Sequence, residues 1–357
     1  MQHWTGTTQI PADLGGSVVT LGNFDGVHRG HRAVLAEVVS RANAEGLASV
    51  AVTFDPHPLA VLFPERAPHL ITSVDHRLDL LAASGVENCL VMEFTRELAS
   101  WSAPRFVEEV FVDALRARAV VVGQDTRFGA NNAGDVQTLL ELGERFGFEV
   151  VVIEDQGEDD DSTDDTDVSG AGGAGDDPAG AAGAPVTPRT RWSSSQVRAM
   201  LAEGDVTAAA SVLGRPHRVS GVVVHGDHRG RELGYPTANL EQHCAGLVPV
   251  DGVYAGWLSR PHLPEGDHDR TLPAAISVGT NPTFDGTQRR VEAYVLDRSD
   301  LDLYGEPVTV EFVERLRPTL RFDSVDELLT QMAQDVADCR RILSTIVPVA
   351  PARTTSD

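Results

Sequence analysis

The sequence lacks the features that mark secreted and membrane-spanning proteins. No apolar run approaches the roughly 18 residues that a transmembrane helix needs, and residues 1–14 do not combine a basic segment with an apolar stretch as a secretory signal does. Cysteine is scarce, since Cys89, Cys244 and Cys339 are scattered without metal-ligand spacing. We therefore expect reduced thiols in a cytoplasmic protein and no disulfide framework.

Basic residues are also few. The chain has 29 Lys and Arg against 53 Asp and Glu, which gives a formal net charge of -24. Nucleic acid and anionic membrane surfaces both select a basic footprint, so we expect neither as a main partner. A phosphate-bearing small molecule remains compatible, because a local cationic site can exist on an acidic protein.

Part of the acidity is confined to one low-complexity segment. Residues 156–189 are mostly Gly, Ala, Asp, Ser and Thr, with almost no large apolar side chains. Such a segment cannot bury enough surface to offset the entropy of ordering it, so we predict a disordered acidic insert. A docking segment for a basic partner is the alternative reading.

The part before the insert alternates between short β-prone runs and helical patterns. The predicted strands span 17–21, 49–54, 89–94, 120–123 and 148–153, and the predicted helices span 32–44, 74–83 and 104–117. Ser73 is a suitable N-cap for the second helix, and Ser102 and Pro104 suit the start of the third. This alternation predicts an α/β fold with a parallel sheet covered on both faces.

The pattern changes after the insert. Two short helices are expected at 196–201 and 207–213, followed by β-prone runs at 218–225, 253–258, 274–278, 291–296 and 308–312. Gly, Pro and Asp turns separate these runs, which is typical of a small antiparallel barrel. A last helix is predicted at 325–343, with Ser324 as its cap and an apolar stripe along one side.

A first candidate site lies where the first strand meets the first helix. Residues 22–31 read GNFDGVHRGH, with glycines that allow close backbone approach to a ligand. A helix N-terminus presents free N–H groups and the positive end of its dipole, which suits a phosphate. His28 and His31 are three residues apart and can point at one phosphoryl group.

A second candidate site lies between two β-prone runs. Residues 226–239 read GDHRGRELGYPTAN, rich in glycine and polar residues. The segment lacks G-x-x-x-x-G-K-S/T, so it is no Walker-type phosphate loop. Taken alone, it is equally compatible with an ordinary long hairpin loop.

The first segment resembles the HxGH nucleotidyltransferases, and its form is similar to the adenylyltransferase module of bifunctional bacterial riboflavin kinase/FAD synthetases. Residues 53–58 (TFDPHP), 122–129 (VGQDTRFG) and 193–198 (SSSQVR) resemble further segments of that module in the same order. Thr126 and Ser195 depart from the usual Phe and Thr. Neither change removes a charge, so we expect altered packing and retained chemistry.

The second segment resembles the Gly- and PTAN-containing stretch of riboflavin kinases. Segments at 251–254 (DGVY), 279–284 (GTNPTF), 291–294 (VEAY) and 303–305 (LYG) follow in the order of that family. The two resemblances together cover nearly the whole chain apart from the insert and the last dozen residues. They imply a Rossmann-like HxGH nucleotidyltransferase domain followed by a small antiparallel β-barrel riboflavin kinase domain with a C-terminal helix.

The resemblance implies a function and a set of site residues. Riboflavin would be phosphorylated with ATP to FMN, and FMN would then take AMP from ATP to give FAD and pyrophosphate, with Mg²⁺ as cofactor. Glu292 would accept the riboflavin hydroxyl proton, and His28 and His31 would contact the phosphates. The implied ATP-binding residues are Gly22, Phe24, Asp25, Gly26, His28, His31, Ser194, Arg198, Gly226, Thr237 and Asn239. The implied flavin contacts are His57, Asp125, Tyr254 and Arg317, and the implied Mg²⁺ ligands are Thr237 and Asn239.

We place the domains at 1–204 and 205–347, with 348–357 as a tail. Two other functions remain open: a riboflavin kinase with an impaired adenylyltransferase module, and a non-catalytic flavin-binding regulator. The second would predict loss of Glu292 or of the paired histidines, and both are present. The sequence leaves the oligomeric state open, a homo-oligomer included.

Overall fold

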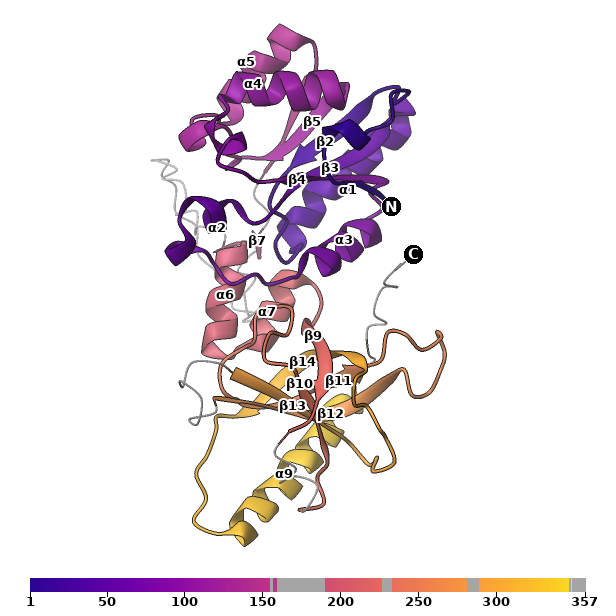
Figure 1. Ribbon diagram of the computed structural model, residues 1–357, viewed down its shortest axis with the longest axis vertical. Coiled ribbons are helices and arrows are strands. Elements are labelled where there is room, and N and C mark those ends of the chain that lie inside the picture. The colour runs from indigo at the N-terminus through magenta and orange to yellow at the C-terminus, as the bar shows by residue number, and fades with distance from the viewer. Residues whose placement is uncertain (155–156, 159–189, 227–232, 281–288, 347, 349–357) are drawn as a thin grey trace, which may run out of the picture.

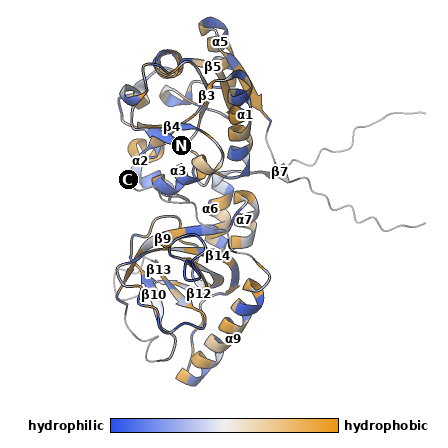
Figure 2. Cartoon of the chain, turned by 90° about the vertical axis from the view of Figure 1, so that its right-hand side faces the viewer, coloured by the Kyte–Doolittle hydropathy of each residue, from blue (hydrophilic) through white to orange (hydrophobic). Residues whose placement is uncertain are grey.

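The computed structural model describes residues 1–154, 157–158, 190–226, 233–280, 289–346 and 348. Two modules are stacked along the long axis of the molecule, with helices α6 (Ser194–Glu203) and α7 (Val206–Leu213) between them (Figures 1 and 2). In the described ranges, every helix is too short or too polar to serve as a transmembrane segment. The three cysteines are free thiols, as expected.

The N-terminal module is built on a six-stranded parallel sheet of order β1-β4-β3-β2-β5-β6. Its strands are β1 (Gln2–Trp4), β2 (Ser17–Leu21), β3 (Ala48–Asp55), β4 (Asn88–Glu93), β5 (Ala117–Gly123) and β6 (Glu149–Ile153). The order reverses between β2 and β5, and open α/β sheets bind ligands in the crevice at such a reversal. The predicted parallel sheet is therefore confirmed, with a switch point beside the GNFDGVHRGH loop.

Helices cover both faces of this sheet, because successive strand residues point to opposite sides. The helices are α1 (Arg29–Glu45), α2 (Pro58–Leu62), α3 (Val74–Ala83), α4 (Ala103–Phe106), a π-helix (Val107–Ala114) and α5 (Val136–Phe146). Short 3₁₀ turns span Thr7–Gln9, Pro64–Arg66, Leu98–Ser100 and Ala130–Asn132. Val50 and Val52 pack towards the π-helix and α5, whereas Ala51 packs towards α1 and α3.

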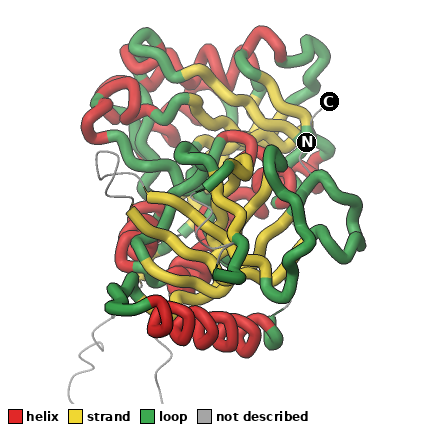
Figure 3. The backbone as a smooth tube through the Cα atoms, turned by 60° about the horizontal axis from the view of Figure 1, so that its bottom comes forward, coloured by secondary structure: helices red, strands yellow, loops and turns green. Residues whose placement is uncertain are grey.

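The C-terminal module is a closed antiparallel barrel of order β10-β13-β12-β11-β14-β9. Its strands are β9 (His217–Val224), β10 (Thr237–Leu240), β11 (Gly252–Ser259), β12 (Thr271–Thr280), β13 (Arg289–Val295) and β14 (Pro307–Arg317). Along β11, Tyr254 and Leu258 point inside, while Ala255 and Trp257 point out to helix α9 (Val325–Leu343). Figure 3 shows α9 lying across the outside of the barrel.

Helices α6 and α7 belong to the same apolar cluster as the barrel interior. Val197 and Leu201 of α6 and Ala209 and Leu213 of α7 pack with barrel residues such as Val219. The predicted domain boundary after residue 204 falls between these two helices. The position of that boundary stays a prediction, but both helices share a core with the barrel.

Several elements match the predictions and several were missed. The helices at 74–83 and 325–343 have the predicted bounds, with the predicted serine caps. The helix predicted at 104–117 runs through α4 and the π-helix and ends at Ala114, because a strand starts at Ala117. The unpredicted elements include α2, α5, β1 and β10. Helix α5 has its signals in Asp135 as cap and Gly147 in the left-handed conformation.

The predicted disordered insert lies almost wholly outside the described residues. Near the start of the insert, β7 (Gly157–Glu158) is described. It pairs antiparallel with β8 (Thr190–Arg191), which directly follows the insert. This pairing corrects the prediction at residues 157–158, because backbone hydrogen bonds to a partner strand compensate for the missing apolar side chains there. The two ends of the insert are thereby brought together next to the start of α6.

The buried imidazole of His217 makes the stability of the fold depend on pH. Its Nε2 lies 2.6 Å from the carbonyl oxygen of Leu247, and burial lowers its pKa from 6.5 to about 4. A depressed pKa means that the folded state favours the neutral ring, so the stabilisation is present above pH 6.5 and is lost as the pH falls towards 4. The difference between the two pKa values corresponds to about 3 kcal/mol in the free energy of unfolding.

We expect the free energy of unfolding of His217→Gln to fall less steeply between pH 6.5 and 4 than that of the wild type. Glutamine keeps a donor for Leu247 but has no proton to gain. Urea unfolding at each pH measures the difference, and His243→Gln at an exposed position is the control. Parallel curves for wild type and His217→Gln would contradict this assignment.

Candidate functional site

The loop between β2 and α1 places two imidazoles side by side. His28 is the N-cap of α1, and its Nδ1 accepts a hydrogen bond of 3.3 Å from the backbone N–H of His31. The two rings stack with centroids 3.7 Å apart and an angle of 21° between their planes. Because Nδ1 of His28 accepts, its ring proton is on Nε2, which can donate to an anion.

Both histidines line a cavity of about 850 Å³ at the carboxyl ends of the sheet strands. Seven of the predicted adenylyltransferase residues meet there: Gly22, Phe24, His28, His31, His57, Asp125 and Ser194. The expectation that the paired imidazoles face a cleft therefore agrees with the geometry. Asp25, Gly26 and Arg198 lie behind the residues that line the cavity. There they hold the loop between β2 and α1.

The environment of His31 favours a neutral ring. Its pKa is well below 6.5, first through burial and then through His28 and Arg77. Its Nδ1 is buried, and no described residue forms a hydrogen bond with it. Burial of this nitrogen and the nearby positive charge of Arg77 both disfavour the imidazolium form.

Arg77 is a buried residue behind the cavity lining that the sequence did not reveal. It comes from α3, is fully buried, and donates from Nη1 to the carbonyl oxygen of Phe54 at 3.1 Å. Burial lowers its pKa, and Asp25 and Asp55 raise it. An arginine in an amphipathic helix is ordinarily exposed, so its position in the sequence gave no sign of this role.

The loop has a backbone conformation that side chains disfavour. Phe24, Gly26 and Val27 have φ angles of 47°, 84° and 39°. A positive φ is uncommon for any residue other than glycine, and it is a true outlier for the β-branched Val27. Such a conformation persists only where surrounding contacts enforce it.

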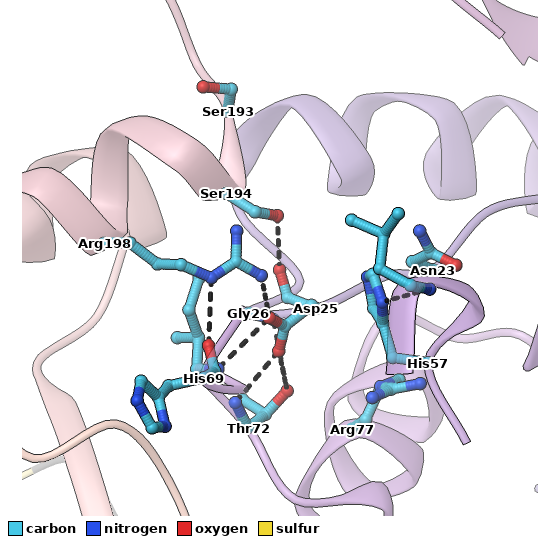
Figure 4. A network of polar contacts seen from close by, with 12 residues as sticks. Asn23, Asp25, Gly26, His57, His69, Thr72, Arg77, Ser193, Ser194 and Arg198 are labelled. Carbon is cyan, nitrogen blue, oxygen red and sulfur yellow. Dashed lines mark hydrogen bonds and ion pairs between the residues drawn. The ribbon is translucent and has the colours of Figure 1, made fainter. Parts of the chain in front are cut away.

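Asp25 supplies several of those contacts, as Figure 4 shows. Its carboxylate accepts from the N–H groups of Ile71 and Thr72 at 3.1 and 3.0 Å, and from Nη2 of Arg198 at 2.5 Å. The Oγ of Ser194 donates to the backbone oxygen of Asp25 at 2.7 Å. The Asp25 and Arg198 side chains, predicted to bind ATP, are thus engaged with each other, and Arg198 also donates to the carbonyl oxygen of His69.

The far part of the cavity is aromatic. Phe54, Phe94 and Phe106 line it, with Phe54 and Phe94 in an edge contact at 5.4 Å between centroids. Flat apolar rings fit such a wall. His57 stands beside it as N-cap of α2, with Nδ1 accepting from Leu59, and burial lowers its pKa.

The second candidate site is assembled on adjacent barrel strands. In the β10–β13 pair, Asn239 lies opposite Glu292. The Thr237 hydroxyl donates to Oε2 of Glu292 at 3.5 Å, and Nδ2 of Asn239 donates to the Thr237 hydroxyl oxygen at 3.2 Å. A Cβ on Gly226 would come within 2.6 Å of the Asn239 amide carbon, so a larger residue there would displace the Asn239 side chain.

Tyr254 and Arg317, the predicted flavin contacts of the barrel, do not lie at this cluster. Tyr254 is fully buried among core residues, and its hydroxyl donates to the carbonyl oxygen of Val250. It therefore forms part of the barrel core, and its flavin contact stays a prediction. Arg317 forms a bidentate ion pair with Asp335 of α9, and its flavin contact stays a prediction. Of the other predicted segments, residues 227–232 and 281–288 lie outside the described residues.

The contacts of the Asp25 carboxylate predict an effect of this residue on stability. We expect Asp25→Asn to lower the free energy of unfolding by about 3 kcal/mol, because Arg198 would lose its buried anionic partner. Thermal and urea unfolding measure this loss. Asp13→Asn, at an exposed position, is the matched control and should leave stability unchanged. Equal stability of Asp25→Asn and wild type would show that the contacts of Asp25 do not hold the loop.

Comparison with known proteins identifies two family regions. Residues 10–167 match a family model described as FAD synthetase, and residues 213–343 match one described as riboflavin kinase. A bifunctional riboflavin kinase/FMN adenylyltransferase of Escherichia coli (strain K12) is 34% identical over 341 residues, which cover 96% of each chain. The enzyme of the same name from Pseudomonas fluorescens is 34% identical over 344 residues, covering 96% of this chain and 98% of that one.

A solved structure supports the arrangement of both modules. It is described as a macrolide-efflux protein from Streptococcus pneumoniae, with a TM-score of 0.76, 29% identity, and coverage of 95% of this chain and 98% of its own. That description names another activity, whereas the curated relatives and both family models agree with each other. The chain belongs to the family of bifunctional riboflavin kinase/FMN adenylyltransferases.

Proposed function

We propose that this chain carries out two successive ATP-dependent reactions at two separate sites. It phosphorylates riboflavin to FMN, and it transfers AMP from ATP to FMN to give FAD and pyrophosphate. The observation that carries the proposal is the presence of both centres in one chain. The stacked His28 and His31 line a cavity with an aromatic far wall, and the Glu292 carboxylate lies beside Thr237 on the barrel.

In the kinase reaction the nucleophile is a neutral alcohol, so it needs a base. We assign that role to Glu292, which takes the proton of the riboflavin terminal hydroxyl as its oxygen bonds to the γ-phosphorus of ATP. Thr237 donates to Oε2 of Glu292 and so directs the carboxylate. The bond between the γ-phosphorus and the bridging oxygen of ATP breaks, and ADP leaves with the electron pair of that bond.

The kinase site also fits a magnesium ion. Hydroxyl, amide and carboxylate oxygens of Thr237, Asn239 and Glu292 lie together, and Mg²⁺ prefers such oxygen ligands. We propose that Thr237 and Asn239 hold the ion with the ATP phosphates. When bound, it neutralises the charge that develops on the phosphates.

In the adenylyl transfer the nucleophile is already an anion. A phosphate oxygen of FMN attacks the α-phosphorus of ATP, and the bond to pyrophosphate breaks, so no strong base is required. The protein contributes positioning and charge stabilisation. Nε2–H of His28 donates to the phosphate groups during the transfer, and His31 stacks on the His28 ring at the same cavity. The side chains of Phe54, Phe94 and Phe106 take the flavin ring.

The three free thiols support a reducing, cytoplasmic location, which we also propose. Riboflavin, FMN and ATP are the partners that the two sites accommodate. The acidic net charge does not oppose them, because the cavity wall carries three histidines and Arg127.

The function is tested by incubating the purified full chain with riboflavin, ATP and Mg²⁺ and resolving the products by chromatography. We expect both FMN and FAD. FMN alone would indicate an impaired adenylyltransferase module, and unchanged riboflavin would indicate a non-catalytic flavin-binding protein.

Two substitutions separate the sites. We expect His28→Ala to lower FAD formation by about 100-fold or more and to leave FMN formation intact. Glu292→Gln should do the reverse when FMN is supplied. His268→Ala and Glu314→Gln, at exposed positions, are the matched controls. Loss of both activities in a folded His28→Ala or Glu292→Gln protein would refute the two-site model.

A further inference from the structure

Arg215 reaches from one module to the active loop of the other. It lies between α7 and β9, in the region that the riboflavin kinase model matches. Its Nη2 donates to the carbonyl oxygen of Gly26 at 2.7 Å, and its Nη1 donates to that of Val27 at 3.4 Å. Nη1 also lies 3.3 Å from the carbonyl oxygen of Leu213, next to Arg215 in its own segment.

The two carbonyls that Arg215 holds control the direction of His28. The Gly26 oxygen belongs to the peptide plane between Gly26 and Val27, and the Val27 oxygen belongs to the plane between Val27 and His28. One planar guanidinium with fixed donor directions therefore orients both peptide planes that lead to the first catalytic imidazole. These planes flank Val27, whose φ of 39° is the least favourable in the loop.

The contact is reciprocal, which makes the junction specific. Arg32, in the first turns of α1, donates from Nη2 to the carbonyl oxygen of Leu213 at 3.3 Å. Gly214 has a φ of +68°, and a side chain there would collide with the Arg32 guanidinium. The Leu213 side chain packs against Gly26. A Cβ added to Gly26 would lie 3.2 Å from Cδ2 of Leu213.

No residue beyond the predicted adenylyltransferase domain of residues 1–204 was expected to act in adenylyl transfer. Arg215 differs from Asp25 and Arg198, because its segment continues directly into barrel strand β9. Asp25 fixes the loop from within the N-terminal module and α6, whereas Arg215 fixes it from the barrel side.

We propose that Arg215 is a positioning residue for adenylyl transfer, holding the carbonyls of Gly26 and Val27 so that His28 and His31 face the phosphates. The inference rests on the proposed FMN adenylyltransferase activity. It makes that activity dependent on a residue of the kinase region. The kinase reaction, whose groups lie on β10 and β13, does not depend on it.

Arg218 provides a matched control on the same segment. It is a mostly buried arginine that forms an ion pair of 3.9 Å with Asp79 of α3, so it also joins the barrel to the N-terminal module. Among the described residues, none of its hydrogen bonds reaches the loop. Arg218→Met therefore weakens the junction without releasing the two carbonyls.

The experiment measures kcat and KM for FAD formation from FMN and ATP, and for FMN formation from riboflavin, in the full chain. We expect Arg215→Met to lower kcat for FAD formation 10- to 100-fold, because a misplaced catalytic group costs about that much. KM for ATP should change less than about 3-fold, and FMN formation should stay within about 2-fold. Arg215→Lys, with one ammonium able to reach the Gly26 oxygen, should recover part of kcat.

Arg218→Met should lower the melting temperature but keep the wild-type ratio of the two activities. Near-wild-type FAD formation by Arg215→Met would overturn the inference, and so would equal losses of both activities in Arg215→Met and Arg218→Met. If Arg215→Met does not fold, the same measurements are made on Arg215→Lys. A selective loss of FAD formation in that variant would support the inference. Absence of FAD formation in the wild type would instead refute the proposed adenylyltransferase function.

Discussion

The left-handed backbone between Phe24 and Val27 is the constraint on which the N-terminal site depends. It turns the chain sharply between β2 and α1, at the point where the strand order of the sheet reverses. This turn brings His28 to the helix N-terminus with its ring against His31. Because the conformation is unfavourable by itself, neighbouring segments must hold it, and they do so through Asp25 from one side and Arg215 from the other.

This requirement gives a physical reason for the way the modules join. Helices α6 and α7 share a core with the barrel. They carry Ser194 and Arg198, which contact Asp25, and Leu213, whose carbonyl oxygen accepts from Arg32 of α1. The active loop of one module is thus shaped by the region that leads into the other. The barrel site has no such dependence, since Thr237, Asn239 and Glu292 lie on strands that pair directly.

The reactions at the two sites also differ in the charge of the nucleophile. The kinase nucleophile is a neutral hydroxyl, and a carboxylate on a barrel strand is a suitable base for it. The adenylyltransferase nucleophile is an anion that needs no base, and neutral imidazoles beside it can donate hydrogen bonds without taking a proton from it. The lowered pKa of His31 fits such a neutral ring.

The sequence by itself determined the class of each module and the presence of both reaction centres. Local signals suffice for this: apolar periodicity, serine caps at 73 and 324, and motifs whose residues are close together in the chain, such as His28 and His31. It also indicated Glu292 through its motif, and β10 then placed Thr237 within hydrogen-bonding distance.

Only the tertiary structure decided which polar residues face a ligand and which hold the scaffold. Asp25 and Arg198 are engaged with each other, Tyr254 is buried in the barrel core, and Arg215 crosses from its own segment to the loop. Residues 25 and 198, or 26 and 215, are brought together by the packing of α6 and α7 between the modules. No local pattern encodes such a contact, because its partners are far apart in the sequence and meet only in the tertiary structure.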